Sequence, residues 1–219
     1  MSETAKPAPP VFDEVFRATL RDLVAWRRDV RRFRRDAVEA GLVMGLLETA
    51  CRAPSVGHSQ PWRFVLVETP ARREAVADSF ARANAEALEG YSGEQRARYA
   101  RLKLEGLHEA PVQLAVFCDE ATAAGSGLGS RTMPETLRYS VVGAIQTLWL
   151  AARAEGLGLG WVSILEPELV TRALDVPTDW VLIGYLCLGW PREEHLDPEL
   201  ERHGWQQRLT VDAGIVLKR

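Results

Sequence analysis

Apolar residues along the chain follow two different spacings. In some stretches they recur every three to four residues, which is typical of a helix that buries one face. Other stretches are short apolar runs bounded by turn residues, which is typical of buried strands. The helical spacing predicts helices over residues 11–25, 36–53, 71–88, 94–109 and 134–155, and the apolar runs predict strands over 62–68, 112–118, 159–165 and 180–188.

Capping and breaking residues sharpen these bounds. Asp36 is a suitable N-cap for the second helix. Pro134 suits the first turn of the long helix, and Gly156 should end it. The two charged helices between residues 71 and 109, the helical excursion, are expected to lie outside the core like a lid. Helices interleaved with strands predict an α+β protein built in layers (an α/β-layer fold).

Composition narrows the class of protein. The 219 residues are 47% hydrophobic and 26% charged, as in an average globular domain, and the net charge of -3 does not indicate a nucleic-acid partner. No apolar run is long enough to span a membrane, and the first ten residues look like a disordered tail rather than a signal peptide. We therefore expect one domain over 11–219, whose polar tail, 191–219, ends in a strand-like stretch at 214–217 and embraces a partner subunit.

The three cysteines carry no metal signal. Cys51, Cys118 and Cys187 show no metal-ligand spacing, and an odd number argues against a disulfide framework. They are predicted to be buried thiols of a cytoplasmic protein.

The strongest chemical signal is "WRRDVRRFR", residues 26–34, in which five of nine residues are arginines. A solvated basic stretch at a helix end is the plainest interpretation. Val30 and Phe33 interrupt the run, however, and are expected to face the core. The planar guanidinium fork suits a phosphate monoester. Arg27 and Arg31, four residues apart in a helical or turning backbone, are predicted to converge on one phosphate.

A second signal is the polar bend within "CRAPSVGHSQPWRFVLVE", residues 51–68. Every residue from Ser55 to Gln60 except Val56 is polar or glycine, which is more than a turn requires and suits a surface that grips a polar ligand. Trp62 should anchor the bend in the core. The glycines of "GLGLGW", residues 156–161, indicate a helix stop followed by a strand, because no GxGxxG opens a helix here.

Three stretches, "RRDVRRF", "APSVGHSQPWRF" and "AARAEGLGLGWVSIL", resemble in their order the FMN-dependent nitroreductase superfamily. The resemblance covers roughly residues 20–210. It implies a central, mainly antiparallel sheet flanked by helices, and an intertwined homodimer with a C-terminal extension and FMN at the interface. The FMN-binding residues that it implies are Arg27, Arg28, Asp29, Val30, Arg31, Ser55, His58, Ser163 and Arg208.

Two residues depart from the common pattern, since Asp29 replaces the usual serine of the arginine stretch and His58 replaces the usual asparagine before "SQPW". Asp29, together with Ser163 in "GWVSI", resembles a narrower branch, the 5,6-dimethylbenzimidazole synthases. The resemblance implies that reduced FMN and O₂ are consumed to give 5,6-dimethylbenzimidazole, the lower ligand of vitamin B12, and D-erythrose 4-phosphate. A separate flavin reductase, using NAD(P)H, would supply the reduced FMN. Asp29 would take a proton at the ribityl C1′, and Ser163 would hold the flavin peroxide near N5, with water excluded.

Other interpretations stay open on the sequence. The protein could be an NAD(P)H-dependent nitroreductase or quinone reductase that keeps its FMN, or a flavin-binding protein without catalysis. Asp29 could be a structural partner of Arg28 or Arg32, and Ser163 a strand serine satisfied by backbone. Tyr139 either touches the flavin or belongs to the core.

Overall fold

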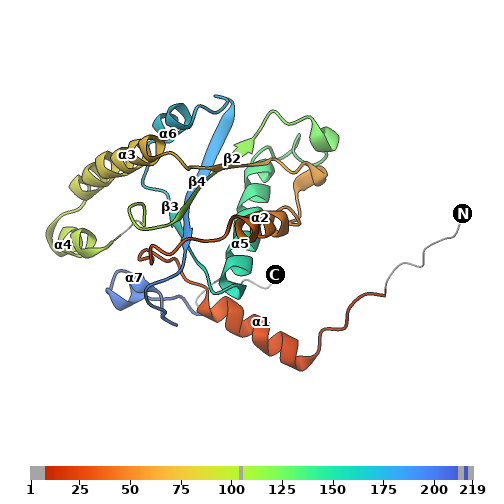
Figure 1. Ribbon diagram of the computed structural model, residues 1–219, viewed down its shortest axis with the longest axis horizontal. Helices are drawn as coiled ribbons and strands as arrows, with labels where there is room; N and C mark the ends of the chain where they lie inside the picture. Colours follow the sequence, from red (N-terminus) through yellow and green to blue (C-terminus); the bar gives the residue numbers. More distant parts are fainter. Residues whose placement is uncertain (1–7, 104–105, 212–214, 217–219) are drawn as a thin grey trace, which may run out of the picture.

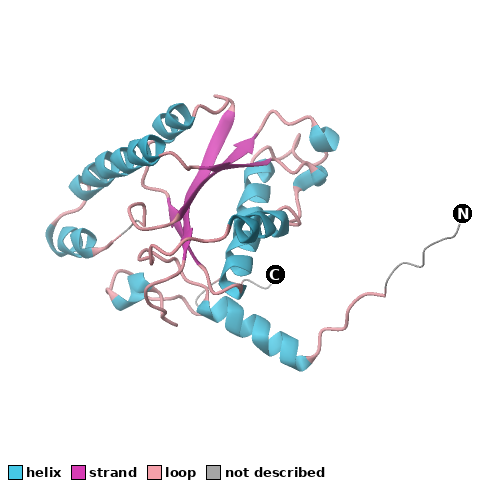
Figure 2. Cartoon of the chain, in the orientation of Figure 1, coloured by secondary structure: helices cyan, strands magenta, loops and turns pink. Residues whose placement is uncertain are grey.

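The computed structural model describes residues 8–103, 106–211 and 215–216. Its centre is a four-stranded antiparallel sheet in the order β1-β2-β4-β3, so that β1 and β3 form the edges (Figures 1 and 2). The predicted mainly antiparallel sheet is confirmed. The strands are β1 (Trp62–Leu66), β2 (Val112–Asp119), β3 (Gly158–Val162) and β4 (Trp180–Gly189).

Helices cover both faces of the sheet. On one face lie α2 (Ala40–Ala50) and the long helix α5 (Thr136–Ala154), and on the other lie α3 (Pro70–Glu89) and α6 (Pro167–Leu174), as Figure 2 shows. The result is an α+β protein of three layers, as expected from the mixture of elements.

Side chains of the central strands alternate between the two cores. In β2, Leu114 and Val116 point toward α5, whereas Ala115 and Phe117 point toward α3 and α6. This alternation follows from the two-residue repeat of a strand. Trp62, at the start of β1, is buried on the α5 side, so its predicted role as an anchor is confirmed.

The first helix, α1 (Glu14–Trp26), is amphipathic as predicted but does not bury its apolar face. Asp13 caps it by accepting a 2.8 Å hydrogen bond from the backbone NH of Phe16. None of its residues is buried, and Val15 is 73% exposed. The helix projects from the body of the molecule (Figure 1), so its apolar face has no cover within the described chain.

Several predicted bounds are wrong. The second helix begins at Ala40 rather than at Asp36, which instead lies 3.6 Å from Arg34 in an ion pair. The second helix of the excursion, α4 (Gly93–Arg101), ends eight residues early. Helix propensity alone does not mark the start of α2 or the end of α4, because the ends of a helix are its least sharply defined part.

Two burial predictions are also wrong. The helical excursion does reach the core, since Val76 of α3 is buried against the sheet and Tyr99 of α4 is buried as well. Of the cysteines, only Cys118 and Cys187 are buried, whereas Cys51, just after α2, is exposed. None of the three cysteines forms a disulfide, and burial raises the pKa of Cys118 to about 11.

The tail leaves β4 and turns back across its own subunit. It includes the short helix α7 (Glu199–Arg202) and places Trp205 against Tyr91 and Tyr99, with ring centroids 5.5 and 6.2 Å apart. The predicted strand at 214–217 and the predicted disordered tail at 1–10 lie largely outside the described residues.

Candidate functional site

The arginine segment, residues 27–33, is an extended stretch that runs along the free edge of β3. It follows directly after α1, and Asp29 forms a parallel bridge to Leu159. The backbone NH of Val30 donates to the Leu159 carbonyl at 3.0 Å. Phe33 is fully buried, as predicted, and Val30 packs against the same core. The segment is therefore built into the fold and is not a solvated basic stretch.

Two glycines of β3 permit this close approach. A Cβ at Gly160 would lie 2.1 Å from the Val30 carbonyl oxygen, and one at Gly158 would lie 2.7 Å from the Val30 side chain. Gly156, with a φ of 77°, ends α5 as predicted. The motif "GLGLGW" thus ends a helix and also forms the surface on which the arginine segment packs. Alternate glycines in a strand are the signal for such a contact.

Asp29 is held against the edge of β3 with its carboxylate still accessible. Its Oδ1 accepts a 2.8 Å hydrogen bond from the backbone NH of Trp161, and its Oδ2 accepts one of 3.1 Å from Nε of Arg31. About a third of the side chain, 36%, remains exposed. Burial raises the pKa of Asp29, while Arg31 and the Trp161 NH oppose that rise. The structural partner of Asp29 is Arg31, so the alternative pairing with Arg28 or Arg32 is wrong.

The arginines of the segment have different partners. The guanidinium of Arg27 stacks 4.9 Å from the ring centre of Trp149 on α5. Arg28 donates to the Leu196 carbonyl through Nε at 2.9 Å. Burial, and then the positive charges of Arg27 and Arg208, lower the pKa of Arg28. Arg28 therefore lies in the field of other positive charges, opposed by Asp197, and this field favours an anion beside it.

The predicted convergence of Arg27 and Arg31 assumed a helical or turning backbone. The segment is extended instead, and four extended residues span about 13 Å. Arg31 turns to Asp29 and to the Lys103 carbonyl, which it contacts through Nη1 at 3.1 Å.

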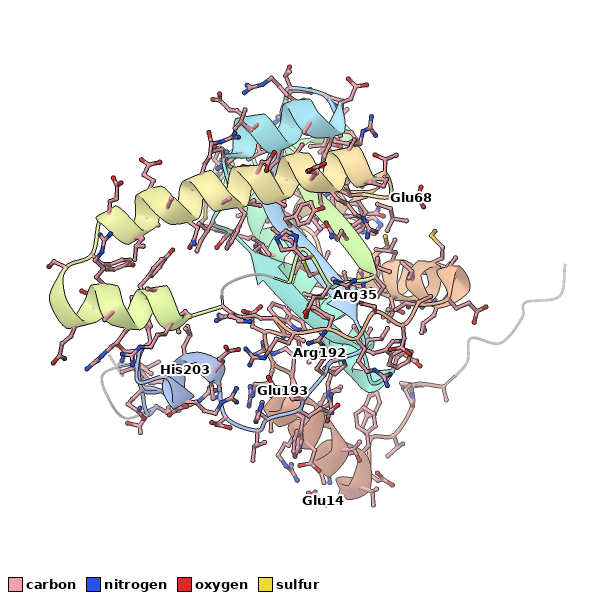
Figure 3. The ribbon with its side chains drawn as sticks, turned by 60° about the vertical axis from the view of Figure 1, so that its left-hand side comes forward. Glu14, Arg35, Glu68, Arg192, Glu193 and His203 are labelled. Atoms are coloured by element: carbon pink, nitrogen blue, oxygen red, sulfur yellow. The ribbon has the colours of Figure 1, made fainter. Side chains whose placement is uncertain are left out.

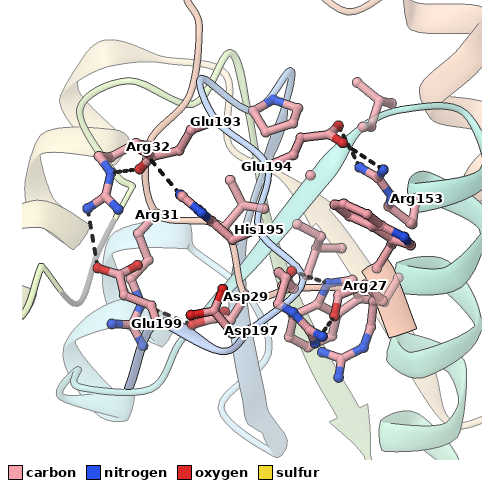
Figure 4. A pocket seen from close by; sticks show the side chains of 18 of the residues that line it. Arg27, Asp29, Arg31, Arg32, Arg153, Glu193, Glu194, His195, Asp197 and Glu199 are labelled. Atoms are coloured by element: carbon pink, nitrogen blue, oxygen red, sulfur yellow. Dashed lines mark hydrogen bonds and ion pairs between the residues drawn. The ribbon is translucent and has the colours of Figure 1, made fainter. Parts of the chain in front are cut away.

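A shallow hollow, partly open to solvent, lies between the arginine segment, the end of α5 and the tail (Figure 4). Arg32 forms ion pairs with Glu193 and, at 3.2 Å, with Glu199. Arg153 binds both carboxylate oxygens of Glu194, at 2.8 and 2.9 Å. These pairs fasten the tail over the segment.

Figure 3 shows the same tail in the whole molecule, with Arg192 and Glu193 on the stretch that follows β4 and His203 at the end of α7. Trp149 and Arg153 on α5 and the acidic tail residues belong to the site but were missed in the sequence. The acidic tail residues give no sign of their partners in the sequence, because Arg153 lies 41 positions from Glu194, and Arg32 lies 161 and 167 positions from Glu193 and Glu199.

Ser163 lies just beyond the end of β3. The strand ends at Val162, and Ser163 is exposed, two residues after the Trp161 whose NH holds Asp29. Among the described residues its hydroxyl has no hydrogen-bond partner, so the interpretation as a satisfied strand serine is wrong.

The polar bend, residues 55–60, lies elsewhere in the subunit. Its short helix η1 (Val56–His58) contacts the start of α5, where the Val56 NH donates to Ser140 Oγ at 3.1 Å. Ser140 precedes Trp149 by nine residues, or about 14 Å along α5. Ser55 and His58 therefore do not line the hollow beside Arg27 in one subunit.

The bend itself is strained and incompletely paired. His58 and Gln60 have φ angles of 57° and 46°, in the left-handed region that non-glycine residues rarely adopt. The hydroxyl of Ser59, 4% exposed, has no partner among the described residues. Strain and an unpaired buried hydroxyl are typical of a site shaped for a ligand. Tyr139, near the start of α5, is 59% exposed, which excludes its assignment to the core.

Comparison with known proteins gives the class. The chain belongs to the nitroreductase family, whose family model matches residues 24–190. A curated 5,6-dimethylbenzimidazole synthase of Rhodospirillum rubrum is 63% identical over 199 residues, covering 91% of this chain and 94% of that protein. The synthase of Rhodobacter capsulatus is 47% identical over 201 residues, or 92% of this chain and 97% of that protein.

Solved structures agree on the fold. Oxidized iodotyrosine deiodinase bound to FMN and 3-iodo-L-tyrosine matches with a TM-score of 0.69 and 27% identity, covering 80% of this chain and 91% of that one. A BluB-like flavoprotein from Clostridium difficile matches with a TM-score of 0.64 and 22% identity, covering 82% and 93%. No helix among the described residues is long and apolar enough to cross a membrane, and no acidic, histidine or cysteine cluster there suits a metal.

Proposed function

We propose that this protein is a 5,6-dimethylbenzimidazole synthase, which uses O₂ to fragment reduced FMN into 5,6-dimethylbenzimidazole and D-erythrose 4-phosphate. The observation that carries the proposal is 63% identity, over nearly the whole of both chains, to a relative of that name. The same relatives favour this function over an ordinary nitroreductase and over a flavin-binding protein without catalysis.

The residues present fit FMN. Arg27, Arg28 and Arg208 supply mutually repelling positive charge, which a phosphate monoester would neutralise. The unpaired hydroxyl of Ser59 and the strained backbone at His58 supply polar groups along a second surface. FMN has both a phosphate and a long polar chain and ring, so it can use both surfaces.

Reduced FMN, when bound, supplies the electrons that O₂ accepts. The residues of the chain would position the flavin and move protons. Asp29 would take the proton from the ribityl C1′, with its Oδ1 held by the Trp161 NH and its Oδ2 by Nε of Arg31. The free hydroxyl of Ser163, just beyond the end of β3, donates a hydrogen bond beside the reacting ring.

The proposed active form is a homodimer with FMN at the interface. One subunit holds its arginine segment and its polar bend about 14 Å apart along α5. The apolar face of α1 is uncovered, and Leu209 and Val211 of the tail are exposed. A second copy, embraced by the tail, would cover these residues and bring its own Ser55 and His58 to the site. A monomer at micromolar concentration with full activity, in sedimentation combined with assays, would contradict this.

The partner reaction is the supply of reduced FMN by a separate NAD(P)H-dependent flavin reductase. Three cysteines without a disulfide are consistent with a reducing, cytoplasmic setting.

The test of the function is anaerobic loading with reduced FMN, an air pulse, and chromatography of both products. We expect one dimethylbenzimidazole and one erythrose 4-phosphate for each FMN lost, from a protein that purifies nearly colourless. A protein that purifies deep yellow, and that turns over NADH by itself while the flavin survives, would instead be a reductase.

A further inference from the structure

Arg31 contacts a carboxylate and a backbone carbonyl, although its place in the arginine stretch suggests a phosphate ligand. Its Nε donates to Asp29 Oδ2 at 3.1 Å, and its Nη1 donates to the Lys103 carbonyl at 3.1 Å. Only 10% of its side chain is exposed. Both contacts lie in the plane of one guanidinium, so they fix its orientation.

The geometry of Asp29 depends on this guanidinium. Its two oxygens have one donor each, the Trp161 NH on β3 and Nε of Arg31. With Arg31 removed, only one oxygen would be held, and the carboxylate could rotate about that single hydrogen bond. Arg27 and Arg28, by contrast, turn to other partners, Arg27 to the ring of Trp149 and Arg28 to the Leu196 carbonyl.

We propose that Arg31 is a positioning residue, which holds the Asp29 carboxylate ionised and in a fixed orientation at the edge of β3, and is not a ligand of the FMN phosphate. This inference rests on the proposed function, in which Asp29 is the base. It separates Arg31, which is committed to the base, from Arg27 and Arg28, which are available to an anion.

The charges around Asp29 give the expected direction of change. Arg31 on the same segment lowers the pKa of Asp29, the Trp161 NH on β3 lowers it as well, and Glu199 on α7 raises it, as does burial. An opposite charge at this distance lowers a carboxyl pKa by about one to three units. Loss of Arg31 should therefore leave Asp29 protonated to a higher pH.

The test titrates Asp29 in flavin-free protein labelled with ¹³C at the aspartate carboxyl. The Asp29→Asn variant, which lacks the resonance, assigns it. Arg31→Gln should raise the midpoint by about one unit or more. Arg31→Lys keeps the charge but loses the fork, so it should raise the midpoint by less. Arg82→Gln is the matched control, because Arg82 pairs with Glu166 at 2.9 Å on the surface, and it should change nothing.

A second readout is the affinity for oxidised FMN. Arg31→Gln should bind FMN within about threefold of wild type, whereas loss of a charge-assisted phosphate contact should weaken binding by about tenfold or more. An unchanged Asp29 midpoint in either folded Arg31 variant would overturn the proposal. A tenfold loss of FMN affinity in Arg31→Gln would also overturn it. A wild-type protein that makes no dimethylbenzimidazole would refute the function alone, since the titration uses no flavin.

Discussion

The arginine segment and the polar bend both carry polar side chains to a surface, but the chain supports them differently. In the segment, Asp29 and Arg31 are paired to each other and to β3 and Lys103 before any ligand arrives. In the bend, His58 is strained, and Ser59 is buried without a partner. A preorganised base needs fixed geometry, whereas a ligand-gripping surface needs groups left free to bind. The difference is consistent with the proposed dimer, in which the segment is complete in one subunit and the bend would be completed by flavin and a second subunit.

The largest effect expected from this comparison concerns the phosphate. If Arg27, Arg28 and Arg208 hold it, riboflavin should bind at least about 100-fold more weakly than FMN, since each charge-assisted hydrogen bond contributes about 1.5–3 kcal/mol. Fluorescence titration with both flavins measures this. Arg27→Gln should weaken FMN binding and leave riboflavin binding unchanged. Equal dissociation constants for the two flavins in the wild-type protein would contradict the assignment of a phosphate site to these arginines.

The seat of the segment should be sensitive to a single methyl group. In Gly160→Ala the new Cβ would lie 2.1 Å from the Val30 carbonyl, so the segment must move. We expect a loss of about 1–3 kcal/mol in the free energy of unfolding. Gly41→Ala on α2 is the control, because its Cβ would meet only the Glu39 side chain at 3.6 Å. Urea denaturation measures the free energy of unfolding of both variants. Equal values for Gly160→Ala and Gly41→Ala would mean that the arginine segment does not require a glycine at position 160.

Ser163→Ala should lower the yield of dimethylbenzimidazole without changing the affinity for FMN. The hydroxyl has no partner among the described residues, so its loss should cost little stability. We expect about tenfold less dimethylbenzimidazole, equivalent to one hydrogen bond of about 1.4 kcal/mol, with FMN affinity unchanged. Unchanged product yield in a single turnover would show that Ser163 takes no part.

The smallest expected effect is a pH-dependent gain in stability. Because the pKa of Asp29 is raised in the folded protein, its ionised form costs folding free energy at pH values above the unfolded pKa of about 3.8. Asp29→Asn should therefore raise the melting temperature at pH 7, and the gain should shrink as the pH falls toward 4. Calorimetry at several pH values measures this. A lower melting temperature at pH 7 would mean that the carboxylate stabilises the fold.

Much of the fold followed from the sequence, and the errors have physical causes. The strands and the long helix, with its stop at Gly156, came from apolar runs and one glycine. The sequence did not show that Asp36 lies outside the second helix, because a side chain that can cap a helix also fits many turns. For the site, the arginine stretch and the polar bend were recognised as chemical signals. The extended backbone that separates Arg27 from Arg31 was not recognised in the sequence, since it depends on contacts with β3, more than 120 residues away.

The most direct test of the central claim is the fate of reduced FMN in Asp29→Asn. The amide keeps an oxygen for the Trp161 NH, so the segment and the phosphate site should survive, and reduced FMN should still bind. It cannot accept the C1′ proton, and loss of a general base typically costs about 100-fold or more. After anaerobic loading and an air pulse, we expect FMN and H₂O₂ in place of dimethylbenzimidazole. Product formation at the wild-type rate would contradict the account and leave Asp29 as only the partner of Arg31.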